Sequence, residues 1–299
     1  MPAGDPFRAQ GRWWRGNLHT HTTLSDGLCT PEAAVAFYRD LGYHFVALTD
    51  HWRWSVTRFE GSLLVLGGIE VDGVDPAAGV YHLVGLAAER PATLQRPEDG
   101  LHPPLDAAIA GLRAAGAAAV MLAHPYWSGE MSRDLLGLDG CCALEIYNAN
   151  CEVLNGKGLS TVHWDDVLAS GRRLWGAAVD DAHWGDHSLD AGLGWVWLRA
   201  PELSRAAICA ALEQGHFYAS SGPEIRDFAM AGGAAYVRCS PAAVIDFGGF
   251  GRYSQRIAAP PGATLAEAEC RLDPRQRYVR VTCRDQAGRQ AWSNPLFLG

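Results

Sequence analysis

Short apolar runs of about the length of a β-strand recur through residues 1–222, and most of them are followed by a histidine or an acidic residue. Residues 43–48 lead to His51, and residues 117–123 lead to His124. Strands that are apolar on both faces and separated by helices are typical of a parallel sheet covered by helices. Closing such units into a barrel gathers the carboxyl ends of the strands on one face. The pattern therefore predicts an α/β fold with polar side chains at one end.

Helix signals separate several of these apolar runs. Thr30 is a favourable N-cap and Pro31 suits the first helical position, which predicts a helix that stops at Gly42. A later helix would begin at Pro201. That helix covers residues 201–214, and the other predicted helices cover residues 105–115 and the neighbourhood of 161–170.

Residues 17–27, with the sequence NLHTHTTLSDG, carry the densest group of candidate ligands. His19 and His21 would leave a strand end two positions apart, so both imidazoles would point to one side. Asp26 follows in a Ser-Asp-Gly turn, where a short carboxylate can bend back toward them. A His-x-His pair alone also occurs on surfaces and in cores, so the metal hypothesis depends on the later strand ends.

Further histidines and carboxylates lie where the later apolar runs end. The full set of candidate metal ligands is His19, His21, Asp26, His51, Glu70, His82, His124, Asp181 and His183. Nitrogen and oxygen ligands without cysteine suit two or three divalent ions such as Mn, Fe or Zn, rather than one structural zinc. The cysteines show no CxxC spacing and are expected to be free thiols.

The net charge limits the possible partners. A formal charge of -8 and a pI near 5.7 argue against nucleic acid and anionic membranes, because either partner would require a basic face. The N-terminal residues lack the apolar stretch of a signal peptide, and no apolar run is long enough to span a membrane. These features predict a cytoplasmic protein with a small-molecule substrate, and they leave its oligomeric state open.

The sequence pattern changes at about Pro223. Gly-rich turns and alternating runs such as residues 278–283 predict antiparallel strands, with residues 285–288 turning the last hairpin. We therefore predict two domains, a barrel with the metal site at residues 1–222 and a small β-rich domain at residues 223–299. The second domain could cap the site, mediate dimerisation or seal the barrel.

Together these motifs resemble those of the PHP (polymerase and histidinol phosphatase) metal-dependent hydrolases, in particular the short branch that includes the CehA/McbA-like proteins. The motifs that carry the resemblance are His-Thr-His-Thr with Ser25-Asp26-Gly27, Thr49-Asp50-His51, Gly68-Ile69-Glu70, His82, Ala123-His124-Pro125 and Asp181-x-His183. They span residues 16–222, and Ala291-Trp292-Ser293-Asn294-Pro295 also resembles the β extension of that branch.

The resemblance implies a distorted (β/α)7 barrel with a small C-terminal antiparallel β appendage. It distributes the ligands over three sites: His19, His21, Glu70 and Asp181 at the first, Glu70, His82 and His124 at the second, and Asp26, His51 and His183 at the third. Glu70 would bridge the first two metals. Many family members carry histidine at the position of Asp26, which leaves the identity and occupancy of the third metal open.

The charges of such a site suggest its chemistry. Two cations that share a carboxylate also share a water, whose pKa falls toward neutrality, and the bridging hydroxide attacks a bound electrophile. A third cation would stabilise charge that develops on the substrate. The candidate catalytic residues are Glu70, Asp181 and His183. Asp181 or His183 could protonate the leaving group, but a metal ligand cannot freely do both, so this role stays open.

Tryptophans follow three of the ligand motifs and could form an aromatic mouth for a flat or apolar part of a substrate. They could equally pack the rim of the barrel. Arg53 is the obvious cation near the site, and a doubly charged phosphomonoester usually meets more Arg or Lys. This favours a phosphodiester or an aryl ester. The candidate substrate-binding residues are Arg53, Trp52, Trp127 and Trp184.

Several polar residues beside the ligands have open roles. Asp50 and Asp180 could orient ligands or cap strand ends. Glu145 and Asn148 end a further strand on the same face and could line the pocket. The role of His187, close after the Asp-x-His motif, is also open.

The main hypothesis is a metal-dependent phosphoesterase that hydrolyses a small organic phosphate ester, either a monoester or a diester. The alternative is a metal-dependent hydrolase of carboxyl or carbamate esters or amides. A non-catalytic metal-binding module is less favoured, because it would be expected to lack ligands and none of the expected positions is missing. A polymerase proofreading module lacks support, since the chain has no polymerase region and no basic groove.

Overall fold

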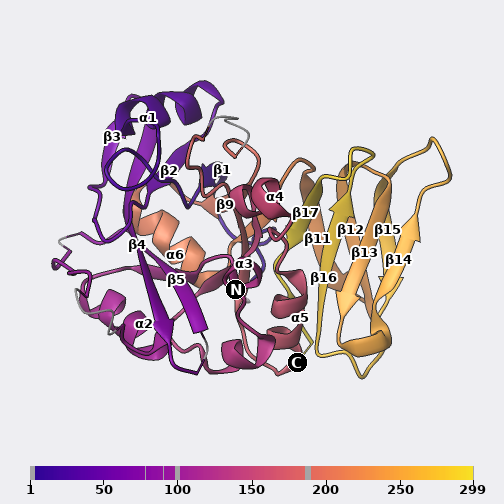
Figure 1. Cartoon of the computed structure of the whole chain (residues 1–299). Coiled ribbons are helices and arrows are strands. Elements are labelled where there is room, and N and C mark those ends of the chain that lie inside the picture. The colour runs from indigo at the N-terminus through magenta and orange to yellow at the C-terminus, as the bar shows by residue number, and fades with distance from the viewer. Residues whose placement is uncertain (1–3, 78, 90, 98–101, 186–189, 299) are drawn as a thin grey trace.

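The structure, a computed structural model, describes residues 4–77, 79–89, 91–97, 102–185 and 190–298. These residues form a mixed α/β protein with one large sheet and few helices (Figure 1), so the coarse α/β prediction is confirmed. The strands before residue 222 are β1 (Arg12–Asn17), β2 (Phe45–Leu48), β3 (Arg58–Glu60), β4 (Leu63–Asp75), β5 (Gly79–Leu86), β6 (Ala119–Leu122), β7 (Ala143–Asn148), β8 (Trp175–Val179), β9 (Trp195–Ala200) and β10 (Phe217–Ser220).

Most of the predicted helices are present. The first begins as expected, because the Thr30 hydroxyl accepts the amide of Ala33 at 3.3 Å. The predicted start at Pro201 is wrong: Ser204 is the N-cap, and the helix begins at Arg205. Among the described residues, no helix has the length and apolar character that crossing a membrane requires. The helices are α1 (Pro31–Asp40), α2 (Leu105–Ala114), α3 (Pro125–Ser128), α4 (Ala149–Asn155), α5 (Thr161–Ala169) and α6 (Arg205–Gln214), with 3-10 turns at Ser132–Gly137 and Gly251–Tyr253.

The large sheet is only partly parallel. Its order is β14-β13-β16-β17-β10-β9-β1-β2-β4-β5-β6-β7-β8, and β1–β2, β2–β4, β6–β7 and β7–β8 are parallel pairs. β5 runs antiparallel to both β4 and β6, because β4 and β5 form a hairpin with no crossover helix between them. The predicted (β/α)7 barrel is not confirmed, since the described sheet is not closed.

The two ends of the parallel region nevertheless meet just beyond β1 and β8. Thr20 and Ala182 form an isolated parallel bridge. The amide of His21 donates to the carbonyl of Ala182 at 3.0 Å, and the amide of Asp181 donates to the carbonyl of His19 at 2.9 Å. The segments that follow these two strands therefore lie side by side.

The strands are buried on both faces, as their apolar character predicts. On one face, Leu18, Phe45 and Met121 pack in a cluster with Leu212 of α6. The other face packs against α2 and α5, where Trp164 is fully buried. This two-sided burial holds the carboxyl ends of the strands in fixed positions.

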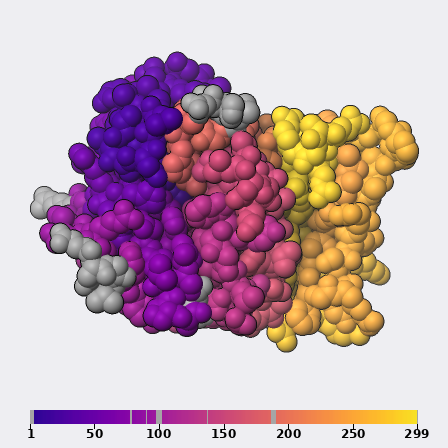
Figure 2. All heavy atoms as spheres, in the orientation of Figure 1, coloured from indigo at the N-terminus to yellow at the C-terminus, as the bar shows by residue number. Residues whose placement is uncertain are grey.

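The C-terminal strands are antiparallel, as predicted, and lie together at one end of the molecule (Figures 1 and 2). β11, β12 and β15 form a separate sheet, whereas pairing of β17 with β10 joins most of the others to the large sheet. The division into domains at residue 222 stays a prediction. These strands are β11 (Ile225–Ala231), β12 (Ala234–Ala242), β13 (Val244–Gly249), β14 (Gln255–Ala258), β15 (Leu265–Arg271), β16 (Tyr278–Arg284), β17 (Gln290–Ser293) and β18 (Leu296–Phe297).

Asn294 connects the C-terminal strands to the first part of the chain. It is 1% exposed, its Oδ1 accepts the amide of Gly176 at 2.9 Å, and its Nδ2 donates to the carbonyls of Gly215 and Phe217. Asn294→Ala is expected to lower the free energy of unfolding by about 2–4 kcal/mol, because three buried backbone groups lose their partner. Urea denaturation measures this loss. Asn155→Ala, at an exposed helix end, should cost less than about 1 kcal/mol, and equal losses in both variants would contradict this account.

Candidate metal centre

The first group of candidate ligands comes from the segments that follow β1 and β8 and from the middle of β4. His19 Nε2 lies 3.1 Å from His21 Nε2, 3.2 Å from Glu70 Oε2 and 3.1 Å from Asp181 Oδ1. His21 Nε2 lies 3.0 Å from Glu70 Oε2 and 3.2 Å from Asp181 Oδ1. Donor atoms bound at about 2.0–2.2 Å to one ion are separated by about 3 Å, so these four side chains are spaced like the ligands of a common cation.

An orphaned oxygen supports this fit. Asp181 Oδ1 is buried and has no hydrogen-bond partner in the described part of the chain, although two imidazole nitrogens lie beside it. A buried carboxylate oxygen without a partner is costly unless a cation binds it. The residues present therefore fit a divalent metal ion.

Glu70 also faces a second group of histidines. Its Oε1 lies 2.9 Å from His82 Nδ1 and 3.6 Å from His124 Nε2, while its Oε2 faces the first group. Asp181 Oδ2 lies 3.7 Å from His124 Nε2. The two oxygens of Glu70 thus point to different sets of imidazoles, which is the arrangement of a bridging carboxylate.

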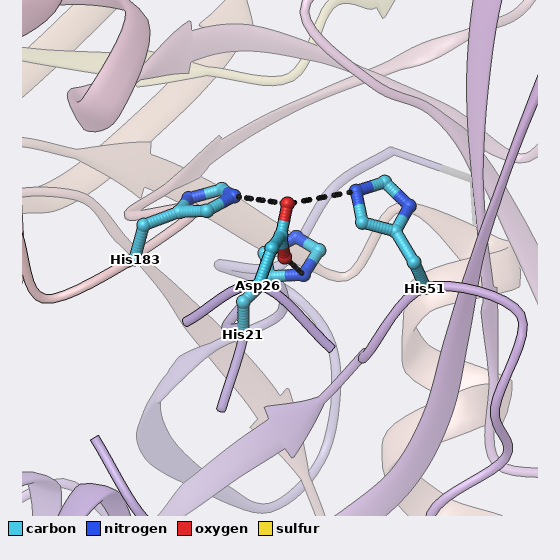
Figure 3. A group of neighbouring side chains, drawn as sticks. All are labelled: His21, Asp26, His51 and His183. Atoms are coloured by element: carbon cyan, nitrogen blue, oxygen red, sulfur yellow. Dashed lines mark ion pairs between the residues drawn. The ribbon is translucent and has the colours of Figure 1, made fainter. Parts of the chain in front are cut away.

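The third group surrounds Asp26 (Figure 3). Asp26 Oδ2 lies 3.6 Å from His51 Nε2 and 3.5 Å from His183 Nε2, and its Oδ1 lies 3.3 Å from His21 Nδ1. All four donor atoms lie close enough to hold one metal ion. Because the side chain of Asp26 is 53% exposed, this group lies nearest to solvent. His187 lies outside the described residues.

The electrostatics of the cluster favour bound cations. Burial opposes a charge on His19, yet Asp181, Glu70 and Glu145 raise its pKa well above 6.5. The pKa of His21 is likewise raised well above its usual value against burial, chiefly by the nearby carboxylates of Asp181 and Asp26. Without a metal, the imidazoles therefore hold protons that a divalent ion must displace.

Glu145 and Asn148 lie behind the ligands and do not line the described cavity. Glu145 Oε1 lies 2.7 Å from His19 Nδ1, and its Oε2 accepts the amide of His124 at 3.0 Å. Asn148 Nδ2 donates to Glu145 and, at 3.1 Å, to Asp181 Oδ2. Both side chains are fully buried, so they fix the orientation of the ligands that they contact.

Asp50 and Asp180 organise loops. Asp50 accepts hydrogen bonds from the amide and hydroxyl of Thr22 and from the hydroxyl of Ser25, which fixes the turn before Asp26. Asp180 accepts hydrogen bonds from the backbone amides of Gly192, Leu193 and Gly194. Burial raises the pKa of Asp180 to about 6. Neither carboxylate belongs to the three groups of possible ligands in the described residues.

Two further carboxylates were not among the sequence candidates. Asp72 Oδ1 lies 3.3 Å from His51 Nδ1 and accepts the indole of Trp52 at 2.7 Å. It follows Glu70 by two positions on β4, so strand alternation could have indicated that the two share a face. Asp190 accepts the amides of His183 and Trp184, and the sequence carries no comparable signal for it.

A cavity of about 580 Å³ opens at the cluster, lined by members of all three ligand groups. Of the candidate substrate-binding residues, Trp127 lines it and the others lie elsewhere. Trp52 packs against the core beneath α2 and α5, Trp184 donates to the carbonyl of His21 and packs against Phe37, and Arg53 is exposed. The described lining also includes the first turns of α4.

No family model matches the sequence, and no curated protein matches it significantly. A solved two-domain protein containing a predicted PHP-like metal-dependent phosphoesterase, from Bacteroides vulgatus ATCC 8482, matches 95% of this chain and 93% of its own, with a TM-score of 0.51 and 14% identity. This likeness shows that the chain shares the fold of that PHP-like protein, which agrees with the resemblance that the motifs indicate. Assignment to the CehA/McbA-like branch stays a prediction.

Two smaller structures also match. A candidate metal-dependent phosphoesterase from Bifidobacterium adolescentis ATCC 15703 covers 59% of this chain and 88% of its own, with a TM-score of 0.41 and 18% identity. An amidohydrolase from Chromobacterium violaceum, with bound sulfate and no metal, covers 58% and 89%, with a TM-score of 0.41 and 17% identity.

The raised pKa values predict how metal binding depends on pH. In the metal-free protein, protonated His19 and His21 stabilise the fold fully below pH 6.5, and this contribution disappears as the pH rises through their raised pKa values. A divalent ion binds the deprotonated imidazoles. The increase in Tm caused by saturating Mn²⁺ or Zn²⁺ is therefore expected to grow from pH 6 to pH 9. Thermal scans with and without metal measure it, and an increase independent of pH would contradict the prediction.

Glu145→Gln tests the buried support of the ligands. The amide keeps the shape of the side chain but removes the negative charge beside His19 Nδ1, so metal affinity is expected to fall by about 10–100-fold. Competition with a chromogenic chelator measures the affinity. Glu152→Gln provides a matched control, because this half-buried carboxylate of α4 contacts the amide of Gly158 rather than a ligand. Wild-type affinity in Glu145→Gln would refute the supporting role.

Proposed function

We propose that the protein is a metal-dependent phosphoesterase that hydrolyses a small organic phosphate ester. The observation that carries this proposal is the position of Glu70, whose two oxygens face separate imidazole groups at the floor of an open cavity. The proposed sites are those of the sequence prediction, with His19, His21, Glu70 and Asp181 at the first, Glu70, His82 and His124 at the second, and Asp26, His51 and His183 at the third. When bound, divalent ions such as Mn, Fe or Zn would activate a water molecule and neutralise charge on the ester.

The thiol in the described part of the cavity does not compete with water as a nucleophile. Cys151 is the one thiol among the described lining residues, and burial together with Asp181 and Glu145 raises its pKa far above neutrality. The thiol therefore stays protonated and is a poor nucleophile. Direct attack by water is the reaction that these residues support.

His183 is the proposed proton donor when it does not hold a cation. Its Nδ1 lies 2.8 Å from the carbonyl of Asp181 and must donate to it, because a carbonyl oxygen can only accept. Its Nε2 therefore faces Asp26 and the cavity. Burial lowers the pKa of His183, but Asp26 and then Asp181 raise it above its usual value, which favours a proton on Nε2 in the metal-free third group.

The charge of the cavity supports a diester more than a monoester. Four carboxylates line its described part, namely Asp26, Glu70, Asp181 and Asp190, and no Arg or Lys does. A doubly charged monoester would find no Arg or Lys in the described lining to supplement the metals. The same observation keeps hydrolysis of carboxyl or carbamate esters or amides as the second candidate function, since such substrates are often uncharged.

Replacing the first pair of ligands tests the catalytic role. His19→Ala with His21→Ala should remove bound metal and lower phosphate-ester turnover by more than about 10³-fold. The assay uses bis-p-nitrophenyl phosphate, p-nitrophenyl phosphate and p-nitrophenyl acetate with added Mn²⁺, alongside metal analysis of the purified protein. His163→Ala is the control, because His163 contacts the carbonyl of Glu130, outside the cluster.

The ester panel separates the candidates. Turnover of phosphate esters supports the proposal, and the preferred ester separates a diesterase from a monoesterase. Cleavage of the acetate alone would favour the second candidate. Bound metal without turnover of any ester would indicate a non-catalytic module, and unchanged activity in the double variant would contradict every hydrolytic assignment to this site.

A further inference from the structure

Three large apolar side chains line the cavity, those of Trp127, Val153 and Leu154, and they are here together called the apolar wall. These side chains are 37%, 47% and 66% exposed, respectively. Large apolar side chains with this exposure lose favourable burial, and when they gather beside a polar site they often mark a binding surface. The candidate ligands occupy the floor of the same cavity, so the wall and the cluster form a single site.

The apolar wall is held rigidly by the cluster itself. Asn148, which donates to Asp181, is also the N-cap of α4, because its Oδ1 accepts the amide of Cys151 at 3.0 Å. This helix carries Val153 and Leu154. A single buried amide side chain therefore links the start of this helix to the candidate ligand Asp181.

Trp127 is held by contacts with two of the candidate ligands. It lies in α3, two residues after Pro125, and its ring meets the ring of His124 edge-on with centroids 5.0 Å apart. It meets the ring of His82 at 5.8 Å, also edge-on. A group bound against Trp127 would thus lie next to the second set of ligands.

We propose that the substrate is an anionic ester that carries an aryl or branched alkyl group, and that this group packs against Trp127, Val153 and Leu154. This inference rests on the proposed function and adds the class of substrate to it. The anionic centre lies at the floor of the cavity, where the imidazoles and carboxylates converge, and the apolar group lies along the wall. Binding removes apolar surface of both the substrate group and the wall from water, and this favours substrates that carry such a group.

The test is a comparison of two unreactive anions. Dimethylphosphinate and methylphenylphosphinate both carry a single negative charge, have no ester bond to hydrolyse, and differ in one methyl or phenyl group. Calorimetric titration into Mn²⁺-loaded protein should show the phenyl compound binding roughly tenfold more tightly, as expected for about 60 Å² of apolar surface removed from water. The readout is affinity, so it does not depend on turnover.

Substitutions in the wall provide the second half of the test. In the double variant Val153→Ser with Leu154→Ser, the preference for the phenyl compound should fall below about threefold, while affinity for dimethylphosphinate stays within about twofold of wild type. Both positions are exposed, so the fold should be retained, and the Tm verifies this. Val162→Ser is the matched control, because Val162 is 69% exposed on α5, outside the described cavity lining.

The outcomes separate the two proposals. Equal affinities of wild type for the two anions, or a preference that survives in the double variant, would refute the apolar wall while leaving the phosphoesterase proposal intact. Failure of both anions to bind to Mn²⁺-loaded wild type would contradict the proposed function, and this inference with it. A preference lost in the double variant but kept in Val162→Ser would support the assignment.

Discussion

The carboxylate of Glu70 is the group on which the arrangement of the site depends. It is 1% exposed in the middle of β4, so its charge must be balanced by groups close to it. Five imidazoles supply that balance: those of His19, His21 and His51 face Oε2, and those of His82 and His124 face Oε1. An arginine or lysine would neutralise Glu70 permanently, whereas an imidazole exchanges its proton for a metal ion near neutral pH. The choice of histidine therefore keeps a buried charge compensated and still allows cations to bind.

The backbone is strained at two of the candidate ligands that converge on Glu70. His124 has a φ of 25°, and Asp181 has a φ of 55°, values that L-residues rarely adopt. Such conformations persist only where surrounding contacts hold them. Glu145 accepts the amide of His124, and the amide of Asp181 donates to the carbonyl of His19 where the segments after β1 and β8 meet. The hydrogen bonds that orient the ligands are thus also the ones that hold the strained backbone.

The sequence predicts the positions of the candidate ligands better than it predicts the sheet. His19, His51 and His124 each follow an apolar run. The carboxyl ends of parallel strands in a buried sheet lie on one side whether or not the sheet closes into a barrel. The antiparallel direction of β5 was not predicted, although the connection between β4 and β5 is too short for a crossover helix and favours a hairpin. Asp190 was not predicted, because it accepts a hydrogen bond from the backbone amide of His183 and such a contact leaves no periodic pattern in the sequence.

The C-terminal strands contact elements next to the cavity but do not line it in the described part of the chain. The described lining ends at Asp190, so no described residue of these strands lines the cavity. Trp292 of β17 stacks on Tyr147 with ring centroids 5.8 Å apart, and Tyr147 directly precedes the N-cap of α4. Arg280 of β16 also holds Asp165 of α5 through two hydrogen bonds. Since α4 carries the apolar wall, a shift of the C-terminal strands would reach the cavity through Tyr147 and Asn148. The shape of the substrate pocket therefore depends on parts of the chain that never touch a ligand.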